Sequence, residues 1–254
     1  MSGFVFYDGP SLIDGAPIVA IAVLESENAK TGDMVQTYIL RADVDPVSAL
    51  RTGEDASICG DCVHRPANDR LVNVDVSTDA PKTLGSCYVN VAQSVQSVYW
   101  AWFRGAYELV APIVGARMIQ GRKLRMGSYG DPAAVPAQFW KQLAKYAAGH
   151  AGYTHQWRKP IARGLRTLVM ASADSAADRD TARSMGWRTF RVRTADESLG
   201  AREIVCPASP EGGDRRQCVT CLACDGADRA GKVSIAIIVH GSKARRFVPI
   251  AVAA

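Results

Sequence analysis

Apolar and β-branched runs alternate with turn-forming residues through the first fifty positions, and this pattern predicts strands. The runs lie at residues 3–7, 17–24 and 34–41, and turn clusters such as Asp8-Gly9-Pro10 separate them. Residues 45–50 predict a short helix, because Pro46 would occupy a first-turn position that proline favours. We therefore expect residues 1–50 to form a β-rich N-terminal segment.

Beyond residue 90, short apolar runs alternate with amphipathic stretches. Strands are expected at residues 123–128, 152–157, 166–171, 187–193, 203–206 and 233–239, and helices at 91–104, 136–148 and 175–185. Strands that alternate with helices at this spacing are typical of parallel β-α-β units. The predicted fold class is therefore α/β: a partial (β/α) barrel or a parallel β/α sheet. Residues 51–254 would carry two cysteine-rich metal-binding loops and form one compact unit with the N-terminal segment.

Composition and charge narrow the class of protein. The 254 residues are 48% hydrophobic and 22% charged, as in an ordinary soluble globular protein. No apolar run approaches the length of a membrane span, and the first residues lack the basic-then-apolar order of a secretory signal. We therefore expect a cytoplasmic protein with reduced thiols and no membrane partner. The net charge of +5 permits an anionic partner without requiring one.

The seven cysteines fall into two groups, and the later group is the stronger sign of a metal. Three of its members are spaced two residues apart, and one lies further upstream: Cys206, Cys218, Cys221 and Cys224. Four thiolates suit structural zinc or a four-iron cluster, and the tight Cys-x-x-Cys-x-x-Cys run slightly favours the cluster. Disulfides are a weaker explanation, because an odd number of cysteines leaves one thiol unpaired.

The earlier group consists of Cys59, Cys62 and Cys87, with His64 nearby. With His64 as the fourth ligand, this group would form a closed structural zinc site. With His64 turned away, three cysteines would hold a four-iron cluster with one iron open, which is the arrangement that allows a cluster to bind and cleave a cofactor. The residues leave these two alternatives level.

Polar residues follow the expected strands of the second half. In parallel α/β folds the functional site lies at the carboxyl ends of the strands, so these residues would converge on one rim. The candidate catalytic residues are Asp131, His155, Asp174 and Arg193; Cys206 joins the rim, and Ser128 and Ser172 are candidate cofactor-binding residues. Each also has a structural explanation: Gly-Asp-Pro is a common turn, and Asp174 is placed to cap the following helix.

Several stretches resemble a family of uncharacterised phage-encoded proteins that are similar to radical S-adenosylmethionine enzymes. They are Gly85-Ser86-Cys87-Tyr88, Arg125-Met126-Gly127-Ser128, Tyr153-Thr154-His155-Gln156-Trp157, Met170-Ala171-Ser172-Ala173-Asp174-Ser175 and residues 186–192. Radical enzymes of this kind usually carry Cys-x-x-x-Cys-x-x-Cys, of which Cys59, Cys62 and Cys87 would be an altered version. The resemblance implies a partial β/α barrel, a host-cytoplasm location, an iron–sulfur cluster with S-adenosylmethionine, and a nucleotide or nucleic-acid substrate.

These observations favour a metal-binding β/α protein, with a divergent radical-type iron–sulfur enzyme as the leading hypothesis. The first alternative is a non-enzymatic zinc protein that contacts nucleic acid or a host partner, supported by the basic run Lys243-Ala244-Arg245-Arg246. The second alternative is a metal-assisted hydrolase with His155, Asp131 and Asp174 as ligands.

Overall fold

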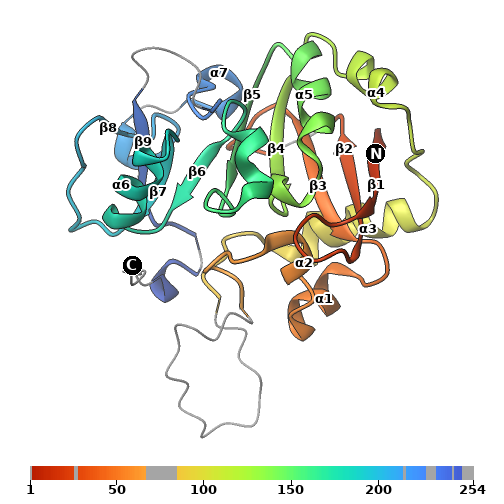
Figure 1. Cartoon of the computed structure of the whole chain (residues 1–254), viewed down its shortest axis with the longest axis horizontal. Helices are drawn as coiled ribbons and strands as arrows, with labels where there is room; N and C mark the ends of the chain where they lie inside the picture. The colour runs from red at the N-terminus through yellow and green to blue at the C-terminus, as the bar shows by residue number, and fades with distance from the viewer. Residues whose placement is uncertain are drawn as a thin grey trace, which may run out of the picture.

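The computed structural model describes residues 2–25, 28–66, 85–213, 216–226, 233–241 and 243–247. In this part of the chain, nine strands form a single sheet in the order β1-β2-β3-β4-β5-β6-β7-β9-β8 (Figure 1). The fold is therefore α/β, as the alternating pattern predicted, with a mixed and mostly parallel sheet.

The N-terminal strands form an antiparallel meander at one end of the sheet. They are β1 (Gly3–Pro10), β2 (Pro17–Val23) and β3 (Val35–Arg41). Residues 18–23 of β2 are all buried, because β2 lies between two strands and both of its faces are covered. β3 then pairs in parallel with β4, so the N-terminal segment continues directly into the rest of the sheet.

The remaining strands all run parallel to one another. They are β4 (Lys123–Tyr129), β5 (Gly149–Thr154), β6 (Met170–Ala173), β7 (Thr189–Arg193), β8 (Glu203–Val205) and β9 (Ser234–Ile238). β5 begins and ends three residues earlier than the apolar pattern indicated. Trp157 therefore lies in the loop after β5, where it is buried and its Nε1 donates a hydrogen bond to the Ser172 carbonyl at 2.9 Å. Because these strands are parallel, their carboxyl ends lie along one edge of the sheet.

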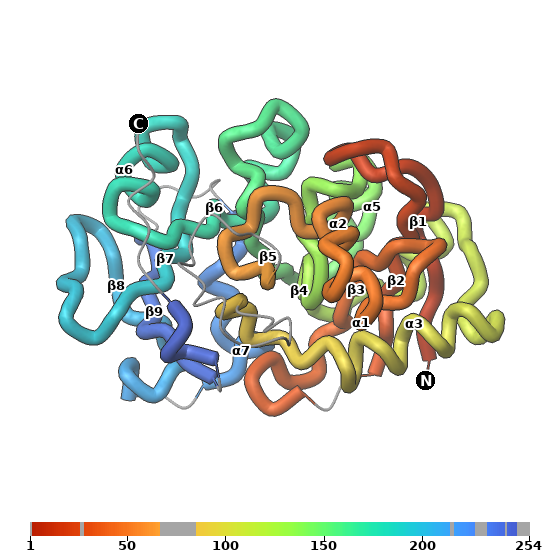
Figure 2. Tube along the Cα trace, turned by 90° about the horizontal axis from the view of Figure 1, so that it is seen from below, coloured from red at the N-terminus to blue at the C-terminus, as the bar shows by residue number. Residues whose placement is uncertain are grey.

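Helices lie on both sides of the sheet (Figure 2). α5 (Ala137–Tyr146) follows β4 and α6 (Ala176–Ser184) follows β6, and both helices were predicted. These two helices lie on one side of the sheet, and α3 (Gln96–Phe103) and α7 (Cys218–Cys221) lie on the other. α1 (Pro46–Thr52) begins at Asp45, whose carboxylate accepts the backbone N–H groups of Val47 and Ser48. A short π-helical turn, Val91–Val95, precedes α3. The pattern did not predict α2 (Ala56–Cys59), α4 (Pro112–Met118) or α7.

The buried side chains form two clusters. The larger cluster includes the indoles of Trp140 and Trp157 and extends across the N-terminal strands. The smaller cluster lies around Met170 and Phe190 and includes two of the seven cysteines, Cys206 and Cys224. Two members of the second cysteine group therefore lie in an apolar interior.

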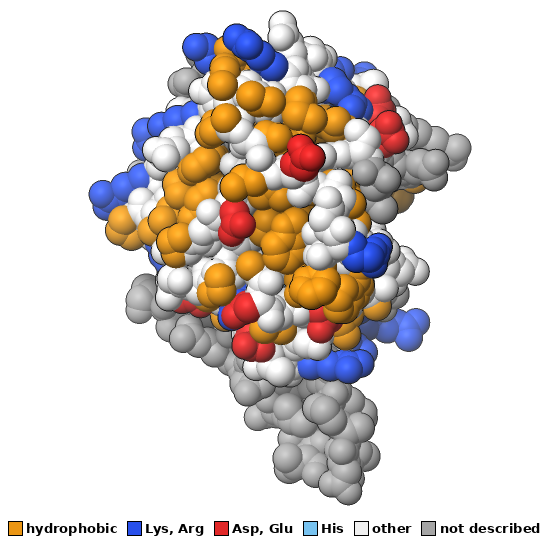
Figure 3. Space-filling view, turned by 90° about the vertical axis from the view of Figure 1, so that its right-hand side faces the viewer, with side chains coloured by type: hydrophobic (Ala, Val, Ile, Leu, Met, Phe, Trp, Pro, Cys, Tyr) orange, Lys and Arg blue, Asp and Glu red, His pale blue; other side chains and the backbone are white. Residues whose placement is uncertain are grey.

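One side of the molecule, over α3 and α4, carries a concentration of apolar side chains (Figure 3). The large exposed hydrophobic residues of this region are Trp100, Phe103, Leu109, Ile113, Val114 and Met118. Among the helices that the structure describes, none has the length and apolar character needed to cross a membrane.

Candidate metal centre at the carboxyl edge of the sheet

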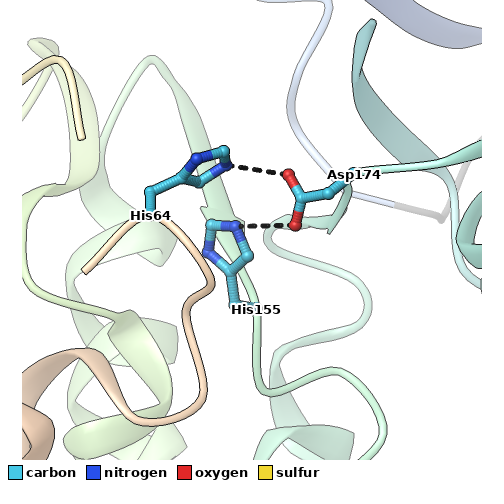
Figure 4. Close-up of side chains that lie close together, drawn as sticks. All are labelled: His64, His155 and Asp174. Atoms are coloured by element: carbon cyan, nitrogen blue, oxygen red, sulfur yellow. Dashed lines mark hydrogen bonds and ion pairs between the residues drawn. The ribbon is translucent and has the colours of Figure 1, made fainter. Parts of the chain in front are cut away.

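Two imidazoles and one carboxylate meet beyond the carboxyl ends of β5 and β6. His155 follows β5, Asp174 follows β6, and His64 lies in the loop after α2 (Figure 4). Asp174 holds both rings: His64 Nε2 lies 2.8 Å from its Oδ1, and His155 Nε2 lies 3.4 Å from its Oδ2. One donor atom from each residue lies within 4.8 Å of the other two, so these residues could hold one metal ion.

The surroundings of His64 orient its ring for this role. Ser86 Oγ lies 2.6 Å from His64 Nδ1, and the opposite ring nitrogen, Nε2, points towards Asp174 and donates its proton to Oδ1. Phe247 stacks on the ring, with 5.7 Å between centroids. Histidine ligands of metal ions commonly have their second nitrogen fixed by such a partner, which sets the tautomer and the ring orientation.

The three groups perturb one another strongly. Burial raises the pKa of Asp174, but the two imidazoles more than offset this effect and hold it well below its usual range. Burial lowers the pKa of His155, but Cys62 and Asp174 raise it well above its usual value. The pKa of His64 is likewise raised by Asp174 against the effect of burial. Without a metal, protons on the two imidazoles therefore balance the charge of the Asp174 carboxylate, and a bound cation would displace these protons.

The first cysteine group adjoins this centre. Cys62 Sγ lies 3.8 Å from His155 Nε2; burial raises the pKa of its thiol, but His155 lowers it overall. The pKa of Cys59 is raised by burial and by the neighbouring Asp55, Cys62 and Cys87. Burial and Cys62 raise the pKa of Cys87 to about 11, and its backbone N–H donates to the His64 carbonyl at 3.0 Å. Three thiols and three nitrogen or oxygen donors thus gather at one edge of the sheet.

Two contacts that the sequence pattern did not indicate hold the Cys59–Cys62 loop in place. The guanidinium of Arg65 binds both carboxylate oxygens of Asp55, at 2.9 and 2.7 Å, and Asp55 is almost completely buried. The side-chain amide of Gln156 donates to the Cys59 carbonyl at 3.1 Å. Gly60 ends α2 with a φ of 55°, which brings the backbone against the Gln156 amide. In the sequence, the only hint of these two contacts is position: Arg65 directly follows His64, and Gln156 directly follows His155.

Asp131 lies beneath the centre and is not one of its three donors. Its Oδ2 accepts the His155 N–H at 2.7 Å, and its Oδ1 accepts the Thr154 hydroxyl at 2.7 Å and the Ala133 N–H at 2.9 Å. Its own N–H donates to the Ile58 carbonyl at 2.6 Å. Asp131 therefore fixes the loop after β5 and ties it to α2.

The other predicted rim residues lie in separate contacts. The guanidinium of Arg193 binds Glu211 and the carbonyls of Thr194 and Glu197. Ser128 Oγ donates to Gln36 Oε1 at 2.5 Å. Ser172 is buried in β6, where its carbonyl receives the indole N–H of Trp157.

The second cysteine group surrounds a cavity on one face of the sheet. Its four members, Cys206, Cys218, Cys221 and Cys224, all line this cavity. The floor consists of side chains from β5, β7 and β9, and the phenol of Tyr153 donates to Cys224 Sγ at 3.5 Å. Among the described residues, no disulfide joins any of the seven cysteines.

The donor set decides which metals suit the first centre. Imidazole nitrogens bind zinc, iron, copper and nickel well, and two histidines with one carboxylate leave coordination positions open. An open position lets a metal ion bind water and lower its pKa, or polarise a substrate oxygen.

Comparison with known proteins gives no match. No family model matches the chain, and neither a curated protein nor a solved structure does. The fold and the site support an α/β protein with a candidate His/His/Asp metal centre at the carboxyl edge of a mostly parallel sheet.

Proposed function

We propose that this protein is a metal-dependent hydrolase that acts on a phosphate-bearing substrate such as a nucleotide or nucleic acid. The observation that carries the proposal is the convergence of His64, His155 and Asp174, whose donor atoms lie within 4.8 Å of one another. Three protein ligands would leave a position for water. Loss of a proton from that water would supply the nucleophile.

A basic segment next to the centre indicates the charge of the substrate. The short 3₁₀ helix Ala244–Arg246 follows Lys243, and Phe247, directly after it, stacks on the His64 ring. Burial raises the pKa of Cys87, and the charge of Lys243 partly opposes this rise, so this cation lies within electrostatic range of the first cysteine group. Cations at this position would attract phosphate groups to the metal.

The test is hydrolysis by protein that has been stripped with a chelator and then reloaded. Zinc, manganese or ferrous iron should restore cleavage of bis(p-nitrophenyl) phosphate or of a single-stranded oligonucleotide, and the chelated protein should be inactive. Asp174→Asn should lose both metal binding and cleavage, because it removes the anionic ligand between the two imidazoles. Asp180→Asn is the matched control: Asp180 is an exposed carboxylate on α6, the helix that follows Asp174, and among the described ion pairs it joins only Arg179. Metal binding without cleavage of any phosphate ester would contradict the proposal.

A second candidate is a radical-type iron–sulfur enzyme, in which Cys59, Cys62 and Cys87 hold the reactive cluster beside S-adenosylmethionine. Two observations favour it. The Cys62 N–H donates to the Cys59 carbonyl at 3.3 Å and the Cys87 N–H donates to the His64 carbonyl at 3.0 Å, so one loop carries all three thiols to this edge of the sheet. Strands β3 to β7 also follow each other in chain order, as in a partial β/α barrel. In this scheme His64, His155 and Asp174 would line the substrate side of the cluster.

Anaerobic purification separates the two candidates. The iron–sulfur form predicts a brown protein whose iron and sulfide decrease in Cys62→Ala, together with reductive cleavage of S-adenosylmethionine. The hydrolase predicts that Cys62→Ala retains its divalent ion and its phosphodiester cleavage. A colourless protein in which both cysteine groups hold zinc and which is inactive in both assays would favour a structural zinc protein instead.

A further inference from the structure

We propose that Cys206, Cys218, Cys221 and Cys224 hold a second, separate metal centre, a four-iron cluster seated on one face of the sheet. This centre shares no residue with the His64, His155 and Asp174 group. It goes beyond the proposed function and stands whether or not that group hydrolyses phosphate esters.

The backbone holds the four cysteines at three anchored points. Cys206 follows β8 directly, and its N–H donates to the Ala236 carbonyl of β9 at 2.8 Å. Cys218 opens α7 and donates its N–H to the Lys30 carbonyl at 2.9 Å. The carbonyl of Cys224 accepts the Gly152 N–H of β5 at 3.0 Å. The two sheet strands and the loop at Lys30 therefore place these thiols before any metal is bound.

A left-handed turn brings the last cysteine back to the cavity. Leu222, which ends α7, has a φ of 50°, a left-handed conformation that is strained for a residue other than glycine. Its side chain packs against Gly149 at the start of β5, which holds the turn in place. The turn separates Cys221 from Cys224, so the chain reverses between two thiols that line the same cavity.

The spacing of the thiols favours a cluster over a single ion. A zinc ion with four thiolates at about 2.3 Å holds its sulfur atoms about 3.8 Å apart. Among the described residues, only His64, His155 and Asp174 bring three donor atoms within 4.8 Å of one another. The four thiols of the second group are therefore more widely spread around their cavity than a zinc tetrahedron requires. A four-iron cube, in which each thiolate binds a different iron, fits a wider set.

The charges around the cavity favour an anionic occupant. The guanidinium of Arg125 is almost fully buried and lies over the ring of Tyr153, with 4.3 Å between its central carbon and the ring centroid. Tyr153 is its ring partner, and among the ion pairs that the structure describes none joins Arg125 to a carboxylate. Lys30 adds a second cation at the wall of the cavity. Burying a cation without an anion is costly, and a thiolate-bound cluster supplies the negative charge.

The cavity floor also suits a redox centre. Cys206 and Cys224 are largely buried, and Ala151, Phe190 and Ile235 form an apolar floor beneath them. The Tyr153 hydroxyl donates to Cys224 Sγ. Burial and hydrogen bonds to the sulfur atoms are the features by which proteins set the potential of such clusters.

The experiment compares iron, sulfide and zinc in anaerobically produced wild-type protein and in the double variant C218A/C221A. The wild type should contain about four iron and four sulfide per chain in this centre, and the double variant should lose that amount. His64→Ala and Asp174→Asn should retain it, which separates failure of this centre from failure of the proposed hydrolase. One zinc ion per chain that disappears in the double variant, or iron that is unchanged by it, would overturn the proposal.

Measurements on the intact chain make the result independent of whether the double variant folds. Electron paramagnetic resonance of the dithionite-reduced wild type should show the signal of a reduced four-iron cluster. Tyr153→Phe should keep the cluster and shift its potential to a more negative value, because it removes the hydrogen bond to Cys224 and keeps the ring that packs on Phe190. Absence of any iron–sulfur signal after anaerobic reconstitution of the wild type would refute the assignment.

Discussion

The carboxylate of Asp131 supports the main chain of His155 from beneath, because its Oδ2 accepts the His155 N–H at 2.7 Å. Asp131 is fully buried and makes this bond while it also anchors the turn that follows β4. The position of one metal-facing imidazole thus depends on a residue from a neighbouring strand end. The sequence predicted that Asp131 lines the rim of the site, whereas in the structure it supports the loop that carries His155.

Asp131→Asn should weaken metal binding without removing a ligand. The amide group that replaces Oδ2 cannot accept the His155 N–H while Oδ1 keeps its other partners, so the imidazole should lose its fixed position. Loss of such outer-shell partners typically costs about 10- to 100-fold in metal affinity. Competition with a chromophoric chelator would measure this loss, with Asp180→Asn as the control. An unchanged affinity in a folded Asp131→Asn protein would show that Asp131 serves only the turn.

The buried pair of Arg65 and Asp55 should be the main electrostatic support of the Cys59–Cys62 loop. Arg65→Met would leave the Asp55 carboxylate buried and unpaired, and breaking a buried pair from one side costs about 3–5 kcal/mol. The exposed pair Arg122–Asp33 has a similar distance, 2.8 Å, and makes a suitable control. Arg122→Met should cost less than about 1 kcal/mol. Urea unfolding of both variants would check the difference, and equal costs would contradict it.

Glu203 should make the stability of the chain sensitive to acid. Burial raises the pKa of this carboxyl, but Arg191 and the Gly200 N–H bind its charged form and lower it overall. A lowered folded-state pKa stabilises the protein above the unfolded-state pKa of about 4.3, and this stabilisation is lost as the pH falls through the folded value.

Replacing Glu203 by glutamine removes the stabilisation that comes from its charged carboxylate. Glu203→Gln should destabilise the protein most near neutral pH and progressively less as the pH falls below about 4.3. Urea unfolding midpoints of the wild type and the variant, measured between about pH 3 and about pH 7, should approach each other as the pH falls. A constant gap across this range would mean that the lost interaction does not depend on the charge of Glu203.

The strands were predictable where apolar content alone decides them, and the exceptions have identifiable causes. β2 was predictable because residues 18–23 are all apolar, and each of their side chains is buried in the structure. β5 was displaced because Gly149 and His150 carry no strand signal, although they pair with β4. α4 was missed because Ile113, Val114 and Met118 lie exposed and break the amphipathic pattern. Four-residue helices such as α2 and α7 are too short to show a period.

The site was predictable only in part, for a similar reason. His155 and Asp174 were found because parallel strands place their carboxyl ends at one edge, which is a property of the fold class. The partnership of His64 with Asp174 spans 110 residues and depends on how the α2 loop packs, which no local pattern encodes. Asp55, Ser86 and Gln156 support the centre through hydrogen bonds, and no pattern in the sequence indicated these supporting roles.

Gly60 gives the most selective test of how the cysteine loop is held. A Cβ added there would lie 2.5 Å from the side-chain amide of Gln156, which would have to release the Cys59 carbonyl. Gly121 has a similarly positive φ, 74°, with nothing within 4 Å of an added Cβ. Both alanine variants should incur backbone strain of about 1–3 kcal/mol, because both positions have a positive φ. Gly60→Ala alone should also release the loop, so it should bind metal more weakly and expose Cys59 and Cys62 to faster alkylation. Equal metal affinity and equal thiol reactivity in the two variants would show that the Gln156 contact does not control the loop.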